Sequence, residues 1–460
     1  MQAISEFKIS KLYGQRDITL KIKDNVLILV GENGSGKTTI LRIMYLFLSG
    51  RWSVLLRYEF EKISILFIDE TKVTLSKDKI PSLLKGSIKD FCISHEIPHG
   101  FQQRYFDWIE ENLNPSNTFK RKDIAEKCYF DILNSRIPSD LALSANSDQI
   151  KELQMALGET SILYLPTYRR IEKELSAIFR GVDENELRSK NTLRNANVPS
   201  SKICSHEIIE FGMRDIKSSI DRVSSELNQF AVEELNNLTL HYLSDVVEEK
   251  YKEVDIELIR DASDESINNI LKRINKNILP QKSRDKLSAT IENIRTKDYN
   301  KTKPNEHERV ICHYLTKLLD FQKDLDKKEE RIRKFCDICN AYIINKQFYY
   351  DSSSFKAYIR YDSKGKSETE KTFDLENLSS GEKQIVSLFS NLYLAKDENF
   401  LILIDEPELS LSVPWQRRFL VDIHNANFCT GIIAVTHSPF IFQNELEPYV
   451  HGLGEFTMGC

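Results

Sequence analysis

The sequence lacks any long uninterrupted apolar run. No segment approaches the roughly 18 consecutive apolar residues that favour a membrane span, so no membrane partner is expected. The first residues, MQAISEFKIS, lack the basic and then apolar pattern of a secretory signal, and a cytoplasmic protein is expected. A strong excess of one charge is also missing, since the formal net charge is −5 with 29% charged residues. Any contact with nucleic acid must therefore be local.

Cysteines at the spacing of a metal site are scarce. Of the eight cysteines in 460 residues, only Cys336 and Cys339 form a CxxC pair, and that pair lies inside a helical pattern. A structural zinc site needs about four ligands, and no second pair is evident. We interpret these cysteines as reduced thiols that fill the core. The length predicts the hydrophobic core of two or three domains.

The first chemically specific feature is GENGSGKT at residues 31–38. It follows the apolar run 25–31, which predicts a buried central strand, and precedes the buried-helix pattern at 40–48. Strand, glycine-rich loop and helix are the context of a phosphate-binding loop, whose backbone N–H groups point at phosphate oxygens. The residues expected at the phosphates are Gly31, Asn33, Gly34, Ser35, Gly36, Lys37, Thr38 and Thr39.

ATP and Mg²⁺ are the ligand and cofactor that this loop predicts. Lys37 supplies a positive charge for the β- and γ-phosphates, and Thr38 offers a hydroxyl to Mg²⁺.

Two more motifs stand about 340 residues later: LSSGEKQ at 378–384 and LILIDEPE at 401–408. The run 401–404 predicts a buried parallel strand, so Asp405 and Glu406 stand at its carboxyl end, where open α/β sheets bind ligands. His437 follows another apolar strand at 431–436.

Other apolar runs predict the strands around these motifs. Residues 7–22 and 63–75 each predict two strands joined by a turn, and 161–166 predicts a further buried strand. Arg169 and Arg170 follow that last strand, as γ-phosphate contacts or as ordinary surface residues. The polar, partly basic stretch 183–205 predicts a loop, which either touches a phosphate backbone or is simply solvated.

The middle of the chain is predominantly helical. Two sets of apolar residues recur at heptad spacing, which predicts an antiparallel hairpin or small bundle, with ordinary helix packing as the alternative. The first set is Ile216, Ile220, Val223, Leu227 and Phe230, and the second is Ile311, Leu315, Leu318, Leu325 and Ile332 with Gln322 and Glu329 between them. Because these seams last only two or three heptads, we expect a stub rather than a long arm.

The phosphate loop, the Ser379-Ser380-Gly381-Glu382 turn and the Asp405-Glu406 strand end together resemble the ABC-type ATPase superfamily. The long helical insertion is similar to the SMC/RecF/OLD branch. The resemblance implies an α/β fold, an ATPase head with a mixed sheet interrupted by a helical, short coiled-coil insertion. The predicted domains are an N-terminal lobe at 1–204, the insertion at 205–345 and a C-terminal lobe at 346–460.

The resemblance implies roles for the matched side chains. Asp405 would hold the Mg²⁺ shell, Glu406 would orient and polarise the attacking water, and His437 resembles the switch histidine that contacts the γ-phosphate. Together with Lys37, these residues are the predicted catalytic group.

A second set of matched residues implies an oligomer. Ser379 and Gly381 resemble the signature pair that binds the γ-phosphate of the opposite subunit, so a twofold, nucleotide-sandwiched dimer is expected. Tyr13 and Arg16 are candidates for contact with adenine or the α-phosphate.

Two departures from the family pattern stand out. Six residues after Glu406, where transporter ATPases carry aspartate and OLD-like ATPases often carry histidine, this chain has Ser412. The 23 residues after His437 are too few for the Toprim domain of OLD nucleases, so any nuclease is expected on another polypeptide.

Several phrases, including LYLPTYRRIE at 163–172 and IEFGMRDI at 209–216, resemble the ATPase subunits of bacterial anti-phage systems. The PARIS ATPase, partnered by a Toprim-type nuclease, is the first choice, and the Septu ATPase, partnered by an HNH nuclease, the second. The expected function is an ATP-binding and hydrolysing sensor-scaffold, oligomeric, that holds a nuclease and releases it on a phage protein or DNA signal. A RecF-like ATPase that clamps duplex DNA is the alternative. A transporter ATPase is disfavoured by the insertion. A structural protein that binds nucleotide but hydrolyses little of it is a further hypothesis.

Overall fold

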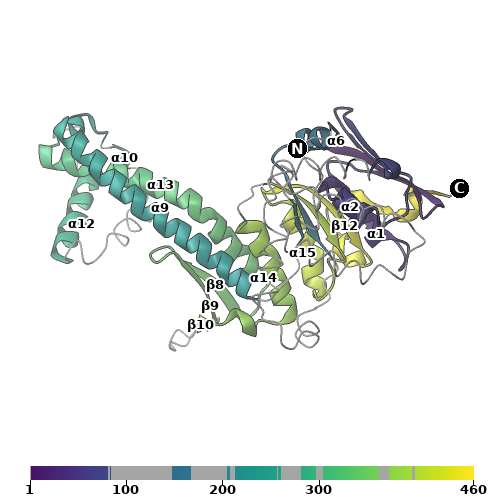
Figure 1. Ribbon diagram of the computed structural model, residues 1–460. Helices are drawn as coiled ribbons and strands as arrows, with labels where there is room; N and C mark the ends of the chain where they lie inside the picture. The colour runs from purple at the N-terminus through teal and green to yellow at the C-terminus, as the bar shows by residue number, and fades with distance from the viewer. Residues whose placement is uncertain are drawn as a thin grey trace, which may run out of the picture. The chain divides into compact units, whose positions relative to one another are not determined.

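In the computed structural model the chain divides into two units, Met1–Glu210 with Lys396–Cys460, and Phe211–Ala395 (Figure 1). The structure describes residues 2–80, 83, 148–166, 205–207, 213–255, 257–260, 281–296, 304–361, 372–395 and 399–459. The predictions for Arg169, Arg170 and the basic stretch 183–204 lie outside these residues. None of the helices within the described ranges has the length and apolar character needed to cross a membrane.

The first unit contains a six-stranded sheet in the order β13-β3-β12-β11-β6-β7, in which every neighbouring pair is parallel. The strands are β3 (Val26–Val30), β6 (Ser161–Leu165), β7 (Ser205–Glu207), β11 (Phe400–Asp405), β12 (Cys429–Thr436) and β13 (Val450–Gly452). β6 and β11 are buried along their whole length, as expected of a parallel sheet covered on both faces. The predicted buried strands are confirmed, and β3 lies inside the sheet.

A five-stranded antiparallel sheet, in the order β14-β2-β1-β4-β5, completes the mixed α/β head. Its strands are β1 (Ile4–Leu12), β2 (Arg16–Lys21), β4 (Lys62–Phe67), β5 (Lys72–Ser76) and β14 (Thr457–Gly459). Both predicted hairpins are present, since β1 pairs with β2 and β4 pairs with β5. Alternate burial along β1 and β2 is the period-two pattern of a sheet with one face in the core.

Helix α1 (Lys37–Leu48) and side chains of both sheets belong to one hydrophobic core. Each residue of 43–48 is buried, and Tyr45 stacks on Tyr164 of β6 with 4.7 Å between the ring centroids. The other described helices of this unit are α2 (Trp52–Leu55), α6 (Asp148–Leu157) and α15 (Val413–His424). A helix buried on all sides gives the loop before it a rigid support.

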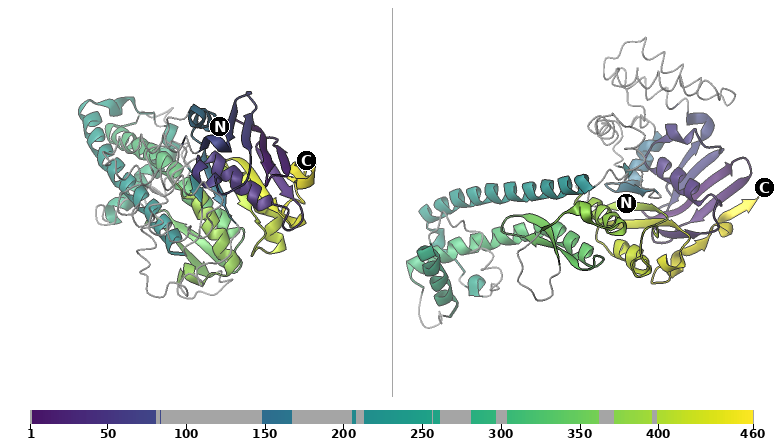
Figure 2. Two further views of the ribbon diagram at one scale, coloured as in Figure 1. Left: turned by 45° about the vertical axis from the view of Figure 1, so that its right-hand side comes forward. Right: turned by 90° about the horizontal axis from the view of Figure 1, so that it is seen from below.

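The second unit is organised on two long helices, α9 (Met213–Val247) and α13 (Glu306–Asn340), each of 35 residues. They lie side by side and run antiparallel (Figures 1 and 2). Two contacts show the direction: Lys328 Nζ lies 4.5 Å from the ring centroid of Phe230, and further along α9 Tyr242 Oη donates to the Val310 carbonyl at 3.5 Å. Two shorter described helices, α10 (Glu257–Arg260) and α12 (Gln281–Thr296), belong to the same unit.

Most residues of the predicted seams are buried, but the helices are longer than a two- or three-heptad stub. Ile216, Ile220 and Leu227 are buried on α9, as are Leu315 and Leu325 on α13. At about 1.5 Å per residue, 35 residues extend about 52 Å. The predicted helices were too short because α9 continues beyond the point where its heptad positions become polar. A search for periodic apolar residues does not detect that part of the helix.

Polar residues inside the seam are satisfied locally. Glu329 is fully buried, and its Oε2 accepts from Arg333 Nη2 at 2.6 Å. Gln322 is also buried and donates to Asp326 Oδ1 at 2.8 Å. Because both side chains find partners one helical turn away on α13, the seam tolerates them without an unpaired buried group.

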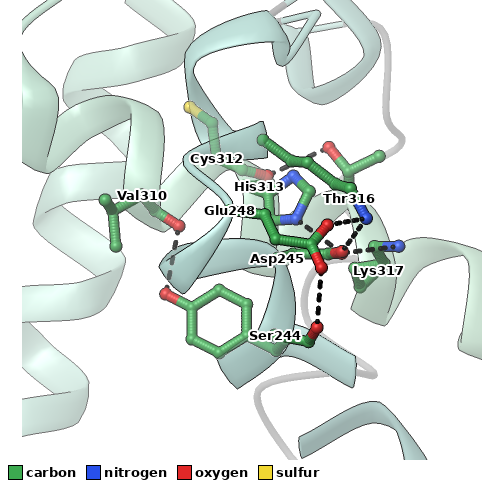
Figure 3. Close-up of polar contacts among 10 residues, drawn as sticks. Ser244, Asp245, Glu248, Val310, Cys312, His313, Thr316 and Lys317 are labelled. Carbon is green, nitrogen blue, oxygen red and sulfur yellow. Dashed lines mark hydrogen bonds and ion pairs between the residues drawn. The ribbon is translucent and has the colours of Figure 1, made fainter. Parts of the chain in front are cut away.

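At the end of α9 the seam is held by a buried carboxylate, Asp245 (Figure 3). Its Oδ1 accepts from Lys250 Nζ at 3.1 Å, and its Oδ2 lies 3.1 Å from both His313 Nε2 and Lys317 Nζ of α13. The pKa of Asp245 is lowered, chiefly by the bond from Lys250 and next by that from Lys317, against the opposing effect of burial. At this end of α9, hydrogen-bonded ion pairs connect the helix to α13.

Replacing Asp245 by asparagine is therefore expected to destabilise this unit by about 2 kcal/mol at neutral pH, because charge-assisted hydrogen bonds are lost. The folded pKa is below the unfolded one, so the contribution is complete above the unfolded pKa of about 3.9. It is lost as pH falls from there toward the folded pKa. Urea transitions at pH 7 and pH 3 would measure it. Asp320→Asn, at an exposed pair with Lys323, is the control, and equal shifts for both variants would contradict the assignment.

The second unit also holds a three-stranded antiparallel sheet and helix α14 (Ser380–Tyr393). The strands are β8 (Lys346–Asp351), β9 (Lys356–Tyr361) and β10 (Thr372–Phe373). The units thus divide at 210 and 395, whereas boundaries at 204 and 345 were predicted. The difference arises because β8 and α14 pack on α13 and its end: ring centroids lie 5.5 Å apart for Phe335 and Phe348, and again for Tyr342 and Phe389.

Candidate nucleotide-binding site

The glycine-rich loop joins the end of β3 to the start of α1, as predicted. Gly34 and Gly36 have φ angles of 78° and 98°, in the left-handed region that favours glycine. Gly36 is also the N-cap residue of α1, so the loop turns directly into the positive end of a helix. Ser35 and Thr39 are half-buried. The exposed positions of the loop are Gly31, Glu32, Asn33 and Gly34.

Lys37 is folded back under this loop. Its Nζ donates to the carbonyls of Gly31 and Glu32 at 2.8 Å each, and to Ser35 Oγ at 3.3 Å. The residue is only 4% exposed. Phosphate oxygens entering the loop would be acceptors of the same kind for the same ammonium group.

The charge of Lys37 is embedded among carboxylates. Burial lowers the pKa of Lys37, and the nearby Glu406, Asp405 and Glu408 oppose that shift by favouring the charged form. Three acidic residues at the end of β11 and in the loop after it therefore stabilise the positive charge of Lys37. In the sequence, 368 residues separate Lys37 from Asp405.

Thr38 and Asp405 form the candidate metal position. Thr38 Oγ1 donates to Asp405 Oδ1 at 3.0 Å, and Asp405 is buried as the last residue of β11. A hydroxyl and a carboxylate are the hard oxygen ligands that suit Mg²⁺, which takes one or two protein oxygens and completes its shell with phosphates and water. Within the described ranges, no group of three or more His, Cys, Asp or Glu residues could hold a metal by itself. The pair fits Mg²⁺ bound together with a nucleotide.

Glu406 has an unusual backbone conformation for a glutamate. Its φ is 49°, in the left-handed region, and its N–H donates to the Val435 carbonyl of β12 at 2.8 Å. Non-glycine residues in this region cost about 1 kcal/mol or more and persist where surrounding structure holds them. The half-buried Glu406 side chain is thus directed by a strained turn at the carboxyl end of the sheet.

His437 follows β12 and is exposed, and its backbone is held by a residue that the sequence analysis did not single out. His437 N–H donates to Glu408 Oε1 at 2.7 Å, and Thr436 Oγ1 donates to Glu408 Oε2 at 2.7 Å. The only sequence feature that could have pointed to Glu408 is its position as the third carboxylate of the DEPE run. Its partners come from a strand 28 residues later in the chain, which no local pattern reveals.

Arg16 and Tyr13 differ in their relation to the loop. Arg16, at the start of β2, donates from Nη1 to the Ser35 carbonyl at 3.4 Å. It therefore lies against the phosphate loop, and its contact with adenine or the α-phosphate stays a prediction. Tyr13 stands in the turn before β2, with 53% of its surface exposed and a φ of 54°.

The Ser379 turn is a capping box at the start of α14, in the second unit. Ser379 Oγ accepts from Glu382 N at 3.4 Å, and Glu382 Oε2 accepts from Ser379 N at 2.8 Å. Lys346 of β8 lies 3.1 and 3.0 Å from the two oxygens of Glu382, a contact that the sequence did not predict. Gly381 is buried in the first turn, whereas Ser379 is exposed. Since the Ser379 hydroxyl accepts in the cap, its own hydrogen remains for an external acceptor.

Ser412 occupies the N-cap of α15 without a side-chain capping bond. It is exposed, as is Ser410, whose φ of 62° is left-handed. The departure from the family pattern therefore lies on an exposed turn, between the carboxylates of β11 and helix α15.

Comparison with known proteins gives one family and a distant structural likeness. The family model described as an AAA ATPase domain matches residues 3–442. No curated protein matches the chain significantly. The Smc head domain with an extended coiled coil, bound to the C-terminal domain of ScpA and derived from Pyrococcus furiosus, is 12% identical over 98% of this chain and 93% of that one, with a TM-score of 0.32. The SmcHead bound to the C-winged helix domain of ScpA is 11% identical, with the same coverage and TM-score.

Proposed function

Because the chain belongs to the AAA ATPase domain family, we propose that it binds ATP with Mg²⁺ at the loop 31–38 and hydrolyses it. The observation that carries this proposal is the convergence of Lys37, Thr38, Asp405 and Glu406 from both ends of the chain. These residue types at the carboxyl end of a parallel sheet suit phosphoryl transfer, where catalysis is mostly positioning and charge stabilisation.

Each side chain has a task in that reaction. Lys37 moves its hydrogen bonds from the loop carbonyls to the β- and γ-phosphate oxygens. Glu406 orients the attacking water and accepts its proton, and His437 contacts the γ-phosphate from the end of the neighbouring strand. Thr38 and Asp405 would hold Mg²⁺, which when bound supplies charge neutralisation at the phosphates.

The Ser379 turn supports an assembly of at least two subunits. Ser379 is exposed at the N-terminus of a 14-residue helix, with a hydroxyl hydrogen free to be donated. Helix N-termini favour anions, so this turn suits a phosphate held by another subunit's loop. The proposed active unit is a twofold dimer, or a larger oligomer built from such dimers, with ATP between the subunits.

The proposed biological role is that of a sensor-scaffold in anti-phage defence. The phrases at 163–172 and 209–216 support it through their resemblance to ATPase subunits of such systems. In this role the ATP-bound oligomer holds a separate Toprim-type or HNH nuclease and releases it on a phage protein or DNA signal. ATP occupancy, rather than fast turnover, would be the maintained state.

The test uses the full chain purified together with the product of the gene next to its own, which the proposal expects to be a Toprim-type or HNH nuclease. With ATP and Mg²⁺, light scattering is expected to show a dimer or larger species, and the nuclease is expected to co-elute with it. A chain that stays monomeric and binds no neighbouring nuclease would refute the scaffold role. Tight duplex binding that falls about 10³-fold or more between 50 and 200 mM salt would instead favour the RecF-like alternative.

A further inference from the structure

Both oxygens of the Glu408 carboxylate accept hydrogen bonds from the neighbouring strand end. Oε1 accepts the His437 N–H and Oε2 accepts the Thr436 hydroxyl, both at 2.7 Å. Thr436 Oγ1 in turn accepts the Ser438 N–H at 3.0 Å. Both oxygens of this carboxylate hold the backbone or side chain of the strand end that carries His437, so its role differs from those of Asp405 and Glu406.

These contacts close into a ring. Ser438 Oγ donates to Gln416 Oε1 at 2.6 Å, and Gln416 Nε2 donates to the Leu411 carbonyl at 2.9 Å and the Glu408 carbonyl at 3.5 Å. The ring passes from the loop after β11, through the first turns of α15, to the residues that follow β12. It joins the segment that carries Glu406 to the segment that carries His437.

We propose that Glu408 is a positioning residue, which fixes His437 against Glu406 so that both meet one γ-phosphate. The proposal rests on the proposed ATPase function and adds a residue to it. The two segments touch at two levels: Glu406 N–H binds the Val435 carbonyl at 2.8 Å, and the Glu408 carboxylate binds the next two residues of the same strand end.

The energetic reason lies in the strained turn between these contacts. Glu406 has a left-handed φ of 49°, and its N–H makes one backbone bond to β12. With that bond alone, the Glu406 side chain and His437 could shift independently of each other. The charged, two-donor bond of Glu408 removes that freedom, since hydrogen bonds to an ionised carboxylate are shorter and stronger than neutral ones. A misplacement of about 1 Å can cost about 100-fold in rate.

The first test is Glu408→Gln, which keeps the size of the side chain. Its amide nitrogen cannot accept a hydrogen bond. If it faces the His437 N–H, that bond is lost; if it faces the Thr436 hydroxyl, that bond must reverse and the hydroxyl hydrogen loses its acceptor. In both orientations the negative charge is lost. The kcat for ATP is expected to fall about 10- to 100-fold, while the Kd for ATP changes less than about threefold. Glu445→Gln is the matched control, because Glu445 accepts one bond from Asn425 outside the ring.

A double-mutant cycle separates positioning from a general structural effect. If Glu408 acts through His437, kcat of the Glu408→Gln/His437→Ala protein equals that of His437→Ala within about twofold. Thr436→Val should reproduce the defect, and Thr436→Ser, which keeps the hydroxyl, should not. The proposal would be overturned if the double variant lost kcat by the product of the two single losses. It would also be overturned if Glu408→Gln and Thr436→Val both kept the wild-type kcat.

Hydrogen exchange gives a readout that does not depend on turnover. In Glu408→Gln the amide of His437 is expected to exchange about tenfold faster, because the bond that protects it is weakened. Unchanged exchange at residues 436–438 would overturn the proposal by itself. If the wild-type protein hydrolyses no ATP, the proposed function fails, and this exchange rate still decides the role of Glu408.

Discussion

Replacing Lys37 by alanine is expected to lower the affinity for ATP by about 100-fold or more, which corresponds to about 2.7 kcal/mol. The reason is that Lys37 is the buried cation of the phosphate loop, 4% exposed, with its Nζ already directed at loop oxygens. Its loss removes the ammonium charge that offsets Asp405 and Glu406 beside the phosphates. Isothermal titration with ATP and Mg²⁺ would measure the change.

Lys77 provides a matched control for this substitution. It is a half-buried lysine whose pKa is likewise lowered by burial, and its Nζ donates to the Tyr58 carbonyl at 2.6 Å. Lys77→Ala should bind ATP as the wild type does. Lys37→Met, which keeps most of the buried length, should bind as poorly as Lys37→Ala. Retained affinity in both Lys37 variants would contradict the phosphate-loop assignment.

Replacing Glu406 by glutamine is expected to lower kcat for ATP hydrolysis by about 10²- to 10³-fold, because an amide cannot take the proton of the attacking water. ATP binding should remain, since Lys37 and the loop are intact. The trapped, ATP-bound protein should then accumulate as the dimer or larger oligomer. Single-turnover phosphate release and light scattering on the same sample would test both parts.

An exposed glutamate serves as the control. Glu61 pairs with Lys11 at 2.7 Å on the surface, and Glu61→Gln should leave kcat unchanged. Equal turnover in the wild type and Glu406→Gln would refute the role of Glu406. Lys37 and Glu406 therefore separate two steps: the first variant loses binding and assembly, whereas the second keeps both and loses turnover.

Local patterns were enough to predict much of this fold. The runs at 25–31, 161–166, 401–404 and 431–436 each became a strand of the parallel sheet, because short continuous apolar runs are typical of strands buried on both faces. The glycine-rich loop was equally readable, since Gly34 and Gly36 adopt φ angles that other residues avoid. These features depend on neighbours within a few residues.

The length of the helical hairpin could not be predicted from local sequence patterns. The seam of apolar residues was visible as far as Phe230, but α9 continues to Val247. Its far end is held by Asp245 with His313 and Lys317, 68 and 72 residues further along the chain. A buried carboxylate and a solvated one look alike in sequence, because what distinguishes them is the set of cations that the fold brings near.

Residue types and their spacing were enough to identify the chemical groups of this protein: a phosphate loop with Lys37 and Thr38, the carboxylates Asp405 and Glu406, and the family to which they belong. How these groups are held depends on contacts between distant parts of the chain. The tertiary structure placed Asp405 3.0 Å from Thr38 across 367 residues, Lys346 on Glu382 beneath Ser379, and Glu408 on the His437 backbone. The reason is physical: residue type and spacing specify what a side chain can donate or accept, but its partner is chosen by strand order and packing, which are non-local.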